Sequence, residues 1–456
     1  MASRISRPNV NNPPLMGREI HDRRLPGYMA STLRGKINKV IFSFVRYKNS
    51  CNNLTFSGHI QTLASMIKKT PDIRIVILLE AENPFDCLDK DTILKHLKGK
   101  GIDPHRANIT FIELEPHRTW QLRDAFYPFI RDIFIMADDN TIILPKRAKR
   151  FSVDYSAMEE EIDYVKGMLG FKVIISDLVF SGGDIIFTDR FQYIGINTIL
   201  ANIDGKPSKE KVEAVKKKFE EQFGRSVIIV SDKGAQPIGH HDIFHVDMYL
   251  TPVGENEVLL ADSVLGYNLM EELPRGSFES SCRNIYKERR KLVAEGLLYD
   301  RLARDPQELD NHEKPSDNIT GLMPASREFQ GLITPGYSNK EASLELQRCL
   351  SLIEQNLTQQ GIVVAGYLPY LQLWKGDHFF TYNNMLLEDY TESDQKRVRR
   401  ALVGISGMTG IDIYAEDVLR GFGFEVVPIS GTFELLGAGS RGGLHCLTNE
   451  TRSFPS

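Results

Sequence analysis

A recurring order of apolar runs and helical patterns constrains the fold of this chain more than any other feature. After about residue 35, two strand-like runs joined by a turn, a helical stretch and a further apolar run recur about five times, without a residue-level repeat. For example, FIRDIFIM and TIILP flank a turn at residues 138–140, which predicts a hairpin. Residues 208–223 show a helical pattern with Ser208 as the expected N-cap. The pattern predicts an α/β fold.

Two segments depart from this order. Residues 1–35 are rich in Pro, Asn and Arg and have no clear period, so we predict an N-terminal arm before a catalytic domain at 36–456. Within that domain, residues 268–338 contain a charged helical stretch and a polar, Pro-containing loop. We interpret this stretch as an insertion over one face, with its charges mostly in solvent.

Composition excludes several classes of protein. A net charge of −4 with 25% charged residues is not typical of a nucleic-acid binder. The most apolar run, IRIVILLEA, is too short to cross a bilayer, and the first residues lack the apolar core of a signal peptide. We therefore expect a cytoplasmic protein without a membrane partner. The oligomeric state is left open.

Cysteine is the residue that points to chemistry. The five cysteines are far apart and none forms a CxxC pair, which argues against zinc and disulfide frameworks. Cys446 lies in RGGLHCLTNE, after the apolar run FEVVPIS and a Gly-rich stretch on which a nucleophile could be presented. Only a thiolate is a good nucleophile, so a cationic partner or ligand would have to activate it. The alternative is a buried structural cysteine, which we accept for the other four.

The segment FHVDMYLT, residues 244–251, supplies a histidine and a carboxylate. We expect a strand here, in which His245 and Asp247 point to one face. Histidine serves as acid and base near neutral pH, and the carboxylate can hold a cation. The wider cluster GHHDIFHVD could bind a metal, but no partnering Cys or HExxH pattern accompanies it. No metal and no cofactor are predicted.

Two weaker motifs add acidic residues. Asp132 lies within FIRDIFIM, where a buried carboxylate would need a partner. It either faces a cationic substrate, pairs with Arg131 or occupies an exposed hairpin position. In SGGDIIFTDRFQYIG, Gly183 and Asp184 indicate a tight turn, which is either a cavity rim or a plain β-turn.

Together and in this order, these segments resemble the guanidino-group-modifying enzymes. That superfamily includes arginine, agmatine and peptidylarginine deiminases, dimethylarginine dimethylaminohydrolase and glycine amidinotransferase. HVDMYLT and HCLTNETR are most similar to peptidylarginine deiminases, and SGGDIIFTDRFQYIG to arginine deiminases and dimethylarginine hydrolases. The resemblance implies a pentein α/β-propeller of ββαβ units in a pseudo-fivefold arrangement. Ser181 departs from it, because many members have an acidic residue there that contacts the catalytic histidine.

The resemblance also implies a reaction. Cys446 would attack the guanidinium carbon of arginine or an arginine derivative, small or protein-bound, while Asp132 and Asp247 hold the planar cation. His245 would protonate the leaving nitrogen and then activate water, so that ammonia and a citrulline-type ureido product leave. Arg441 would meet a substrate carboxylate or carbonyl, although it could equally be a surface residue. The other candidate substrate-binding residues are Asp184, Gly183, Gly443 and Asn384, the last within FTYNNMLLE.

Two alternatives share this site. An amidinotransferase would pass the amidino group from the cysteine to an amine rather than to water. A catalytically silent pentein would bind a partner through the 268–338 insertion. A papain-like protease fits poorly, because here the histidine precedes the cysteine in the chain.

Overall fold

The computed structural model describes residues 31–43, 53–80, 90–104, 107–114, 134–138, 141–146, 172–232, 245–273, 340–373, 378–432 and 443–453. The predicted arm is outside these ranges up to residue 30, and the predicted insertion is outside them from residue 274 onward. Asp132 and Arg441 also lie outside the described residues. None of the described helices is long and apolar enough to span a membrane.

The described strands are between 3 and 11 residues long. In chain order they are β1 (Lys36–Ser43), β2 (Arg74–Glu80), β3 (Ile109–Leu114), β4 (Ile135–Asp138), β5 (Thr141–Leu144), β6 (Lys172–Ile175), β7 (Ile185–Phe187), β8 (Phe191–Gly195), β9 (Ser226–Val230), β10 (Leu250–Pro252), β11 (Glu257–Asp262), β12 (Val363–Leu373), β13 (His378–Thr381), β14 (Leu386–Thr391), β15 (Arg397–Gly404), β16 (Glu425–Ile429) and β17 (Thr448–Ser453).

The helices alternate with the strands. They are α1 (Asn53–Lys69), α2 (Lys90–Gly99), α6 (Ile196–Ala201), α7 (Lys209–Phe223), α8 (Ser263–Glu272), α12 (Lys340–Gln359), α13 (Thr409–Gly421) and α15 (Leu444–Leu447), with the 3-10 turns η1 (Gly182–Asp184) and η2 (Val246–Met248). Helix α7 has the predicted N-cap, because the Ser208 side chain accepts a hydrogen bond from the backbone N–H of Lys211, and the helix ends at Gly224, which is in the left-handed conformation.

The described strands form five sheets, three with three strands and two with four, and the sheets share one three-stranded pattern. In each sheet an antiparallel pair is followed by a parallel neighbour, as in β4–β5–β6, β7–β8–β9 and β14–β15–β16. A helix precedes the third strand where the connection is described, because a parallel neighbour requires a crossover. The α/β class and the β4–β5 hairpin are therefore confirmed. The arrangement of the units around a pseudo-fivefold axis stays a prediction.

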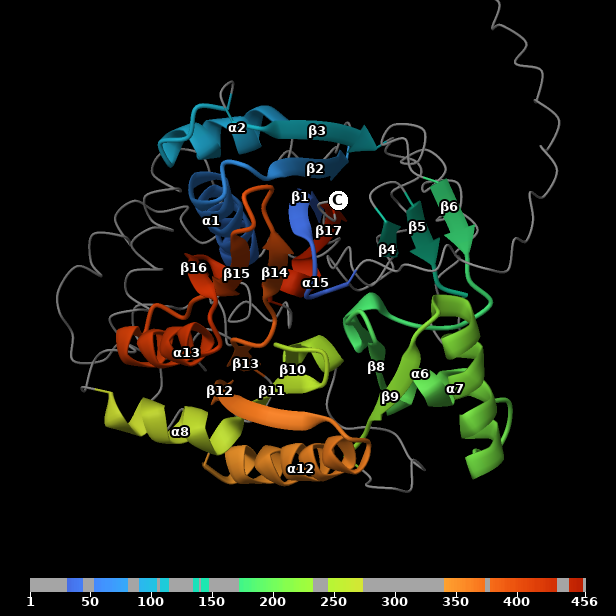
Figure 1. Cartoon of the computed structure of the whole chain (residues 1–456). Coiled ribbons are helices and arrows are strands. Elements are labelled where there is room, and N and C mark those ends of the chain that lie inside the picture. The colour runs from blue at the N-terminus through green and yellow to red at the C-terminus, as the bar shows by residue number, and fades with distance from the viewer. Residues whose placement is uncertain are drawn as a thin grey trace, which may run out of the picture.

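One sheet joins residues from both ends of the sequence. Strand β1 pairs antiparallel with β17, from Lys36 opposite Ser453 to Phe42 opposite Thr448, and parallel with β2. Figure 1 shows β17 and α15 beside β1, although the two segments are far apart along the chain. This pairing fixes the residues immediately after Cys446.

One predicted strand is wrong in detail, and a second segment divides between two sheets. In FTYNNMLLE, β13 ends at Thr381 in the sheet of β12, and β14 begins at Leu386 in the sheet of β15. The residues between them carry the chain from one sheet to the next. HVDMYLT is not a strand from its first residue, because η2 precedes β10, which pairs with β11 only from Leu250 onward.

Candidate active site

Cys446 lies in the short helix α15, directly before β17. Its side chain is 2% exposed and packs within the largest cluster of buried apolar residues. The turn is held at its end by Thr448, whose hydroxyl donates to the carbonyl of Leu444 at 2.9 Å. The β1–β17 ladder begins at the same residue, so the sulfur is presented from a fixed backbone.

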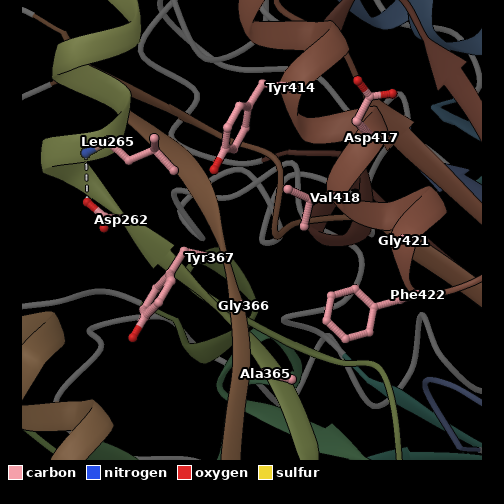
Figure 2. A pocket seen from close by; sticks show the side chains of 10 residues that line it. All are labelled: Asp262, Leu265, Ala365, Gly366, Tyr367, Tyr414, Asp417, Val418, Gly421 and Phe422. Carbon is pink, nitrogen blue, oxygen red and sulfur yellow. Dashed lines mark hydrogen bonds between the residues drawn. The ribbon is translucent and has the colours of Figure 1, made fainter.

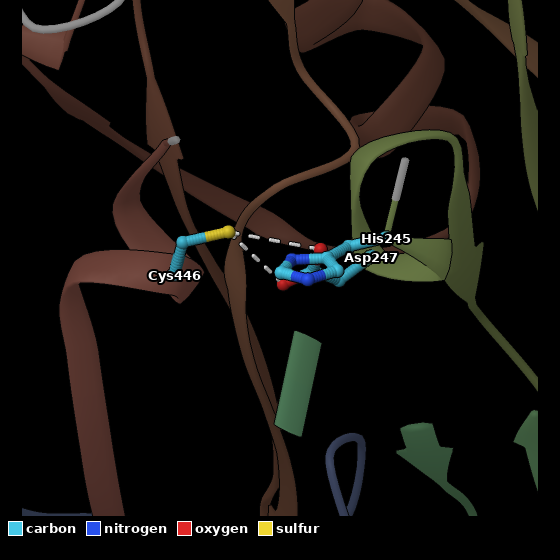
Figure 3. A group of neighbouring side chains, drawn as sticks. All are labelled: His245, Asp247 and Cys446. Atoms are coloured by element: carbon cyan, nitrogen blue, oxygen red, sulfur yellow. Dashed lines mark hydrogen bonds between the residues drawn. The ribbon is translucent and has the colours of Figure 1, made fainter. Parts of the chain in front are cut away.

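His245 and Asp247 reach the sulfur from η2 and not from a strand. The backbone N–H of Met248 donates to the carbonyl of His245 at 3.1 Å, which closes a 3-10 turn. A turn of this kind does not alternate faces, so the period-2 argument was wrong. The two side chains nevertheless meet Cys446, and one ligand atom from each residue lies within 4.8 Å of the others (Figure 3).

The closest contacts in this group are to the Asp247 carboxylate. Cys446 Sγ lies 3.3 Å from Oδ2 and 3.7 Å from Oδ1 of Asp247. Nδ1 of His445 lies 2.8 Å from the same Oδ2. His445 and Asp247 are both 2% exposed. The sequence interpretation missed His445, although it stands next to the nucleophile in LHCL.

A second group of residues orients His245. The Ser181 hydroxyl lies 3.1 Å from Nε2 of His245. A Cβ atom added to Gly183 would stand 2.4 Å from Nδ1 of the same ring, so the position is free of a side chain because the imidazole fills that space. Gly183 was expected beside the substrate, and the structure places it behind the histidine.

Asp184 contacts α6 and the glycine that precedes it. Its Oδ2 accepts a hydrogen bond from the Thr198 hydroxyl at 2.5 Å, and a Cβ on Gly195 would overlap its carboxylate. The residue is 8% exposed. This hydrogen bond ties η1 to α6.

Asn384 and Gly443 form the other wall beside the sulfur. The backbone N–H of Cys446 donates to Oδ1 of Asn384 at 3.2 Å, and Nδ2 of Asn384 donates to Sγ at 3.1 Å. A Cβ on Gly443 would stand 2.7 Å from that Oδ1. Both residues were expected at the substrate. In the structure the Asn384 amide contacts Cys446, and Gly443 lies against Asn384 at a position where a side chain would overlap the amide.

Acidic residues dominate the electrostatics around the site. Burial raises the pKa of Tyr249 well above its usual value, and the charges of Asp184, Asp232 and Asp247 raise it further. Tyr249 therefore stays a neutral phenol. Carboxylates concentrated in a buried region disfavour further negative charge and favour a cation.

The same geometry bears on metal binding. His245, Asp247 and Cys446 offer an imidazole nitrogen, a carboxylate oxygen and a sulfur close enough to share one ion. These are donor types that zinc accepts, and a bound metal would occupy the sulfur. An ion there would therefore compete with nucleophilic use of Cys446.

A pocket of about 470 Å³ lies elsewhere, between α8, β12 and α13 (Figure 2). Its wall combines aromatic and acidic side chains, and Asp262 in it also caps α8 by accepting from the N–H of Leu265 at 2.7 Å. None of its lining residues belongs to the group around Cys446. They are Asp262, Leu265, Ala365, Gly366, Tyr367, Tyr414, Asp417, Val418, Gly421 and Phe422.

Comparison with known proteins shows which solved structures have a similar fold. No protein-family model matches the sequence, and no curated protein matches it. Solved structures do match it over nearly its whole length. Agmatine deiminase from C. jejuni is 12% identical with a TM-score of 0.52, covering 95% of this chain and 97% of that chain. The chain has the fold of the pentein superfamily.

Two further pentein structures agree with this result. A putative agmatine deiminase is 12% identical with a TM-score of 0.53, covering 94% of this chain and 97% of that chain. Agmatine deiminase of Enterococcus faecalis is 10% identical with a TM-score of 0.51, covering 93% and 96%. At such identities the likeness concerns the pentein fold alone, so the chemistry has to be argued from the side chains around Cys446.

Proposed function

We propose that this chain hydrolyses the guanidinium group of arginine or an arginine derivative, free or protein-bound. The observation that carries the proposal is the meeting of Cys446, His245 and Asp247 within 4.8 Å, from segments about 200 residues apart. A thiol, an imidazole and a carboxylate are the groups that cysteine-based attack on a cationic carbon requires. The fold is shared with agmatine deiminases, and agmatine is a guanidino compound.

Asp247 explains why a cation would activate the sulfur. With its oxygens 3.3 and 3.7 Å from Sγ, a charged Asp247 disfavours a second anion there. A guanidinium group bound to this carboxylate would cancel that repulsion, and the thiolate would then form beside its target carbon. Substrate binding and nucleophile activation would thus be one event.

The first half of the reaction makes the covalent intermediate. The Cys446 thiolate forms a C–S bond to the guanidinium carbon, and the C=N electron pair moves onto nitrogen. Protonated His245 gives its proton to the leaving nitrogen, the C–N bond breaks, and ammonia departs. A thiouronium remains on the sulfur.

In the second half His245 acts as a base. It takes one proton from water, whose oxygen attacks the same carbon, and the C–S bond then breaks to return the thiolate while the remaining O–H proton passes to solvent as the C=O bond forms. The ureido product leaves. Ser181 supports this role, because a hydroxyl at 3.1 Å holds the ring in place and can accept or donate as the ring changes its protonation.

Two further residues, Asp132 and Arg441, are assigned to the proposed site from their sequence motifs alone. Asp132 would provide a second acceptor for the planar cation, and Arg441 would meet the substrate's carboxylate or backbone carbonyl. Both positions lie outside the described residues. Asp184, whose carboxylate accepts a hydrogen bond from Thr198, would contribute to substrate binding through its negative charge.

The test is a substrate panel. Purified protein is incubated with arginine, agmatine, a methylated arginine and an arginine-containing protein, with a chelator present, and ammonia and ureido groups are measured. We expect one of these to react, Cys446→Ser to abolish the reaction, and Cys349→Ser to retain it. Cys349 is a half-buried cysteine on α12 and serves as the matched control.

The same assay separates the two alternatives. An amidinotransferase would release the amine portion of the substrate only when an acceptor amine such as glycine is added, and would form no ureido product. A silent pentein would give no product from any compound. Activity that survives Cys446→Ser would refute the nucleophile assignment.

A further inference from the structure

We infer that Asn384 is a catalytic residue that stabilises the Cys446 thiolate by donating a hydrogen bond to the sulfur, and that it does not bind the substrate. This inference deepens the proposed function and rests on it, because Asn384 is catalytic only if Cys446 acts as the nucleophile. The hydrogen bond itself does not depend on which substrate is used.

The direction of the Asn384 amide is fixed by chemistry. A backbone N–H can only donate, and the N–H of Cys446 lies 3.2 Å from one end of this amide. That end must therefore be the oxygen, Oδ1. The nitrogen, Nδ2, is then the end that lies 3.1 Å from Sγ. An inverted amide would put two donors face to face at the backbone.

The protein environment holds the amide in this position. A Cβ on Gly443 would stand 2.7 Å from Oδ1 and 2.9 Å from Cβ of Asn384, so the missing side chain at 443 is what admits it. Nδ2 also lies 3.1 Å from Sδ of Met248, and Asn384 is 2% exposed. A side chain this enclosed has little freedom to leave the sulfur.

The backbone on either side of Asn384 is anchored as well. Tyr382 donates its hydroxyl hydrogen to Asp412 at 2.7 Å. Asn383 donates to the Thr251 hydroxyl at 3.1 Å and accepts at its carbonyl from the same hydroxyl at 3.0 Å. These contacts fix the crossing between β13 and β14, which is the segment that carries Asn384.

Sγ consequently lies between a donor and an acid. Asn384 approaches it with an N–H, and Asp247 approaches it with a carboxylate oxygen at 3.3 Å. The donor favours the thiolate and the carboxylate opposes it, so a bound cation that neutralises Asp247 leaves the Asn384 contribution unopposed. A donor aimed at the reacting atom performs this task without touching the substrate.

The experiment measures the thiol directly. The full-length protein is treated with iodoacetamide between pH 5 and 10, and alkylation is followed by mass spectrometry of the tryptic peptide at residues 442–452, which contains Cys446 and no other cysteine. Asn384→Asp keeps an oxygen for the backbone N–H of Cys446 and removes the donor to sulfur. Asn384→Leu removes both contacts at nearly constant volume.

We expect both variants to shift the half-maximal pH of alkylation upward. A hydrogen bond to a charged group is worth a shift of about 1 to 2 pH units, and the shift should be larger for Asn384→Asp, which adds a negative charge. At pH 7 the alkylation rate should fall about 10-fold or more. Should Asn384→Asp not fold, Asn384→Ala, which only removes atoms, must show the same upward shift.

The outcome separates this inference from the proposed function. If folded variants alkylate at the wild-type pH, Asn384 only supports the backbone and the inference is wrong, whatever the substrate panel shows. If alkylation shifts while no guanidino compound reacts, the thiolate role stands and the proposed reaction fails. Where a substrate is found, kcat should fall in Asn384→Leu with little change in KM, because a substrate-binding role would raise KM instead.

Discussion

Replacing Gly183 by alanine tests how tightly His245 is positioned. The added Cβ would lie 2.4 Å from Nδ1, 2.9 Å from Cγ and 3.2 Å from Cβ of His245, whereas ordinary van der Waals contact begins at 3.4 Å. The added atom would crowd Cβ of His245 as well as the ring, so rotation of the His245 side chain cannot remove the overlap. The ring must move by about 1 Å, or η1 must move away from it.

The expected magnitude follows from that displacement. A 1 Å misplacement of a catalytic group can cost about 100-fold in rate, so kcat should fall by about two orders of magnitude. Overpacking of a buried site should also lower the free energy of unfolding by about 1–3 kcal/mol. Backbone conformation is not the cause, since Gly183 has no positive φ.

Gly421→Ala is the matched control. A Cβ at Gly421, the last residue of α13, meets no atom within 4 Å. This variant should keep wild-type kcat, and its stability should be unchanged or raised by up to about 1 kcal/mol. Both variants are measured by steady-state kinetics and urea denaturation. Equal kcat and equal stability for Gly183→Ala and Gly421→Ala would refute the steric account of His245.

Two further predictions concern buried histidines. Nδ1 of His445 lies 2.8 Å from Asp247, and the amide nitrogen of Asn can take its place, so His445→Asn should keep most of kcat/KM. His445→Gln should lower kcat/KM about 10-fold or more. Equal kcat/KM values for the two variants would contradict a role for this donor. Burial lowers the pKa of His59 to about 4 from 6.5. Between these two pH values His59 is protonated in the unfolded chain but not in the folded protein. The free energy of unfolding should therefore fall by about 3 kcal/mol as pH drops from 6.5 to 4. Urea denaturation of His59→Gln should lack this part of the pH dependence, and an identical profile would exclude it.

Much of the fold could be predicted because each unit is encoded locally. The β4–β5 hairpin has two apolar runs around a polar turn, and α7 has a serine before its first turn and a glycine after its last. Its buried residues Val212, Val215 and Phe219 also recur at helical spacing. Such features need no knowledge of the rest of the chain.

The parts that sequence could not supply depend on distant partners. Strand β17 reads TNETRS and has no apolar pattern, yet Glu450 and Arg452 are buried because they pair with each other at 3.1 Å and β1 covers the backbone. The residues of η2 have the composition of a strand, but a ladder partner exists only from Leu250 onward. Tertiary pairing decides both cases.

The sequence predicted the reacting residues of the candidate site but not the contacts that hold them, because those contacts depend on distant partners. The motifs RGGLHCLTNE and FHVDMYLT, and their resemblance to guanidino-group-modifying enzymes, singled out Cys446, His245 and Asp247. The supporting contacts of Asn384 and His445 could not be assigned, since an amide or imidazole in sequence does not reveal which atom it will face. Only coordinates distinguish a residue that holds the nucleophile from one that holds the substrate.

The pairing of β1 with β17 has a consequence for how the protein acquires activity during synthesis. Strand β17, which follows the segment that carries the sulfur, pairs with residues 36–43, which are synthesised about 400 residues earlier, so this pairing can form only after residues 448–453 have been made. A nascent chain would thus contain His245 and Asp247 about 200 residues before it contains Cys446 and the strand that follows it. Under the proposed function the thiol would become reactive only once β17 has paired with β1, and a break in the chain that separates these two strands should abolish activity without changing any reacting group.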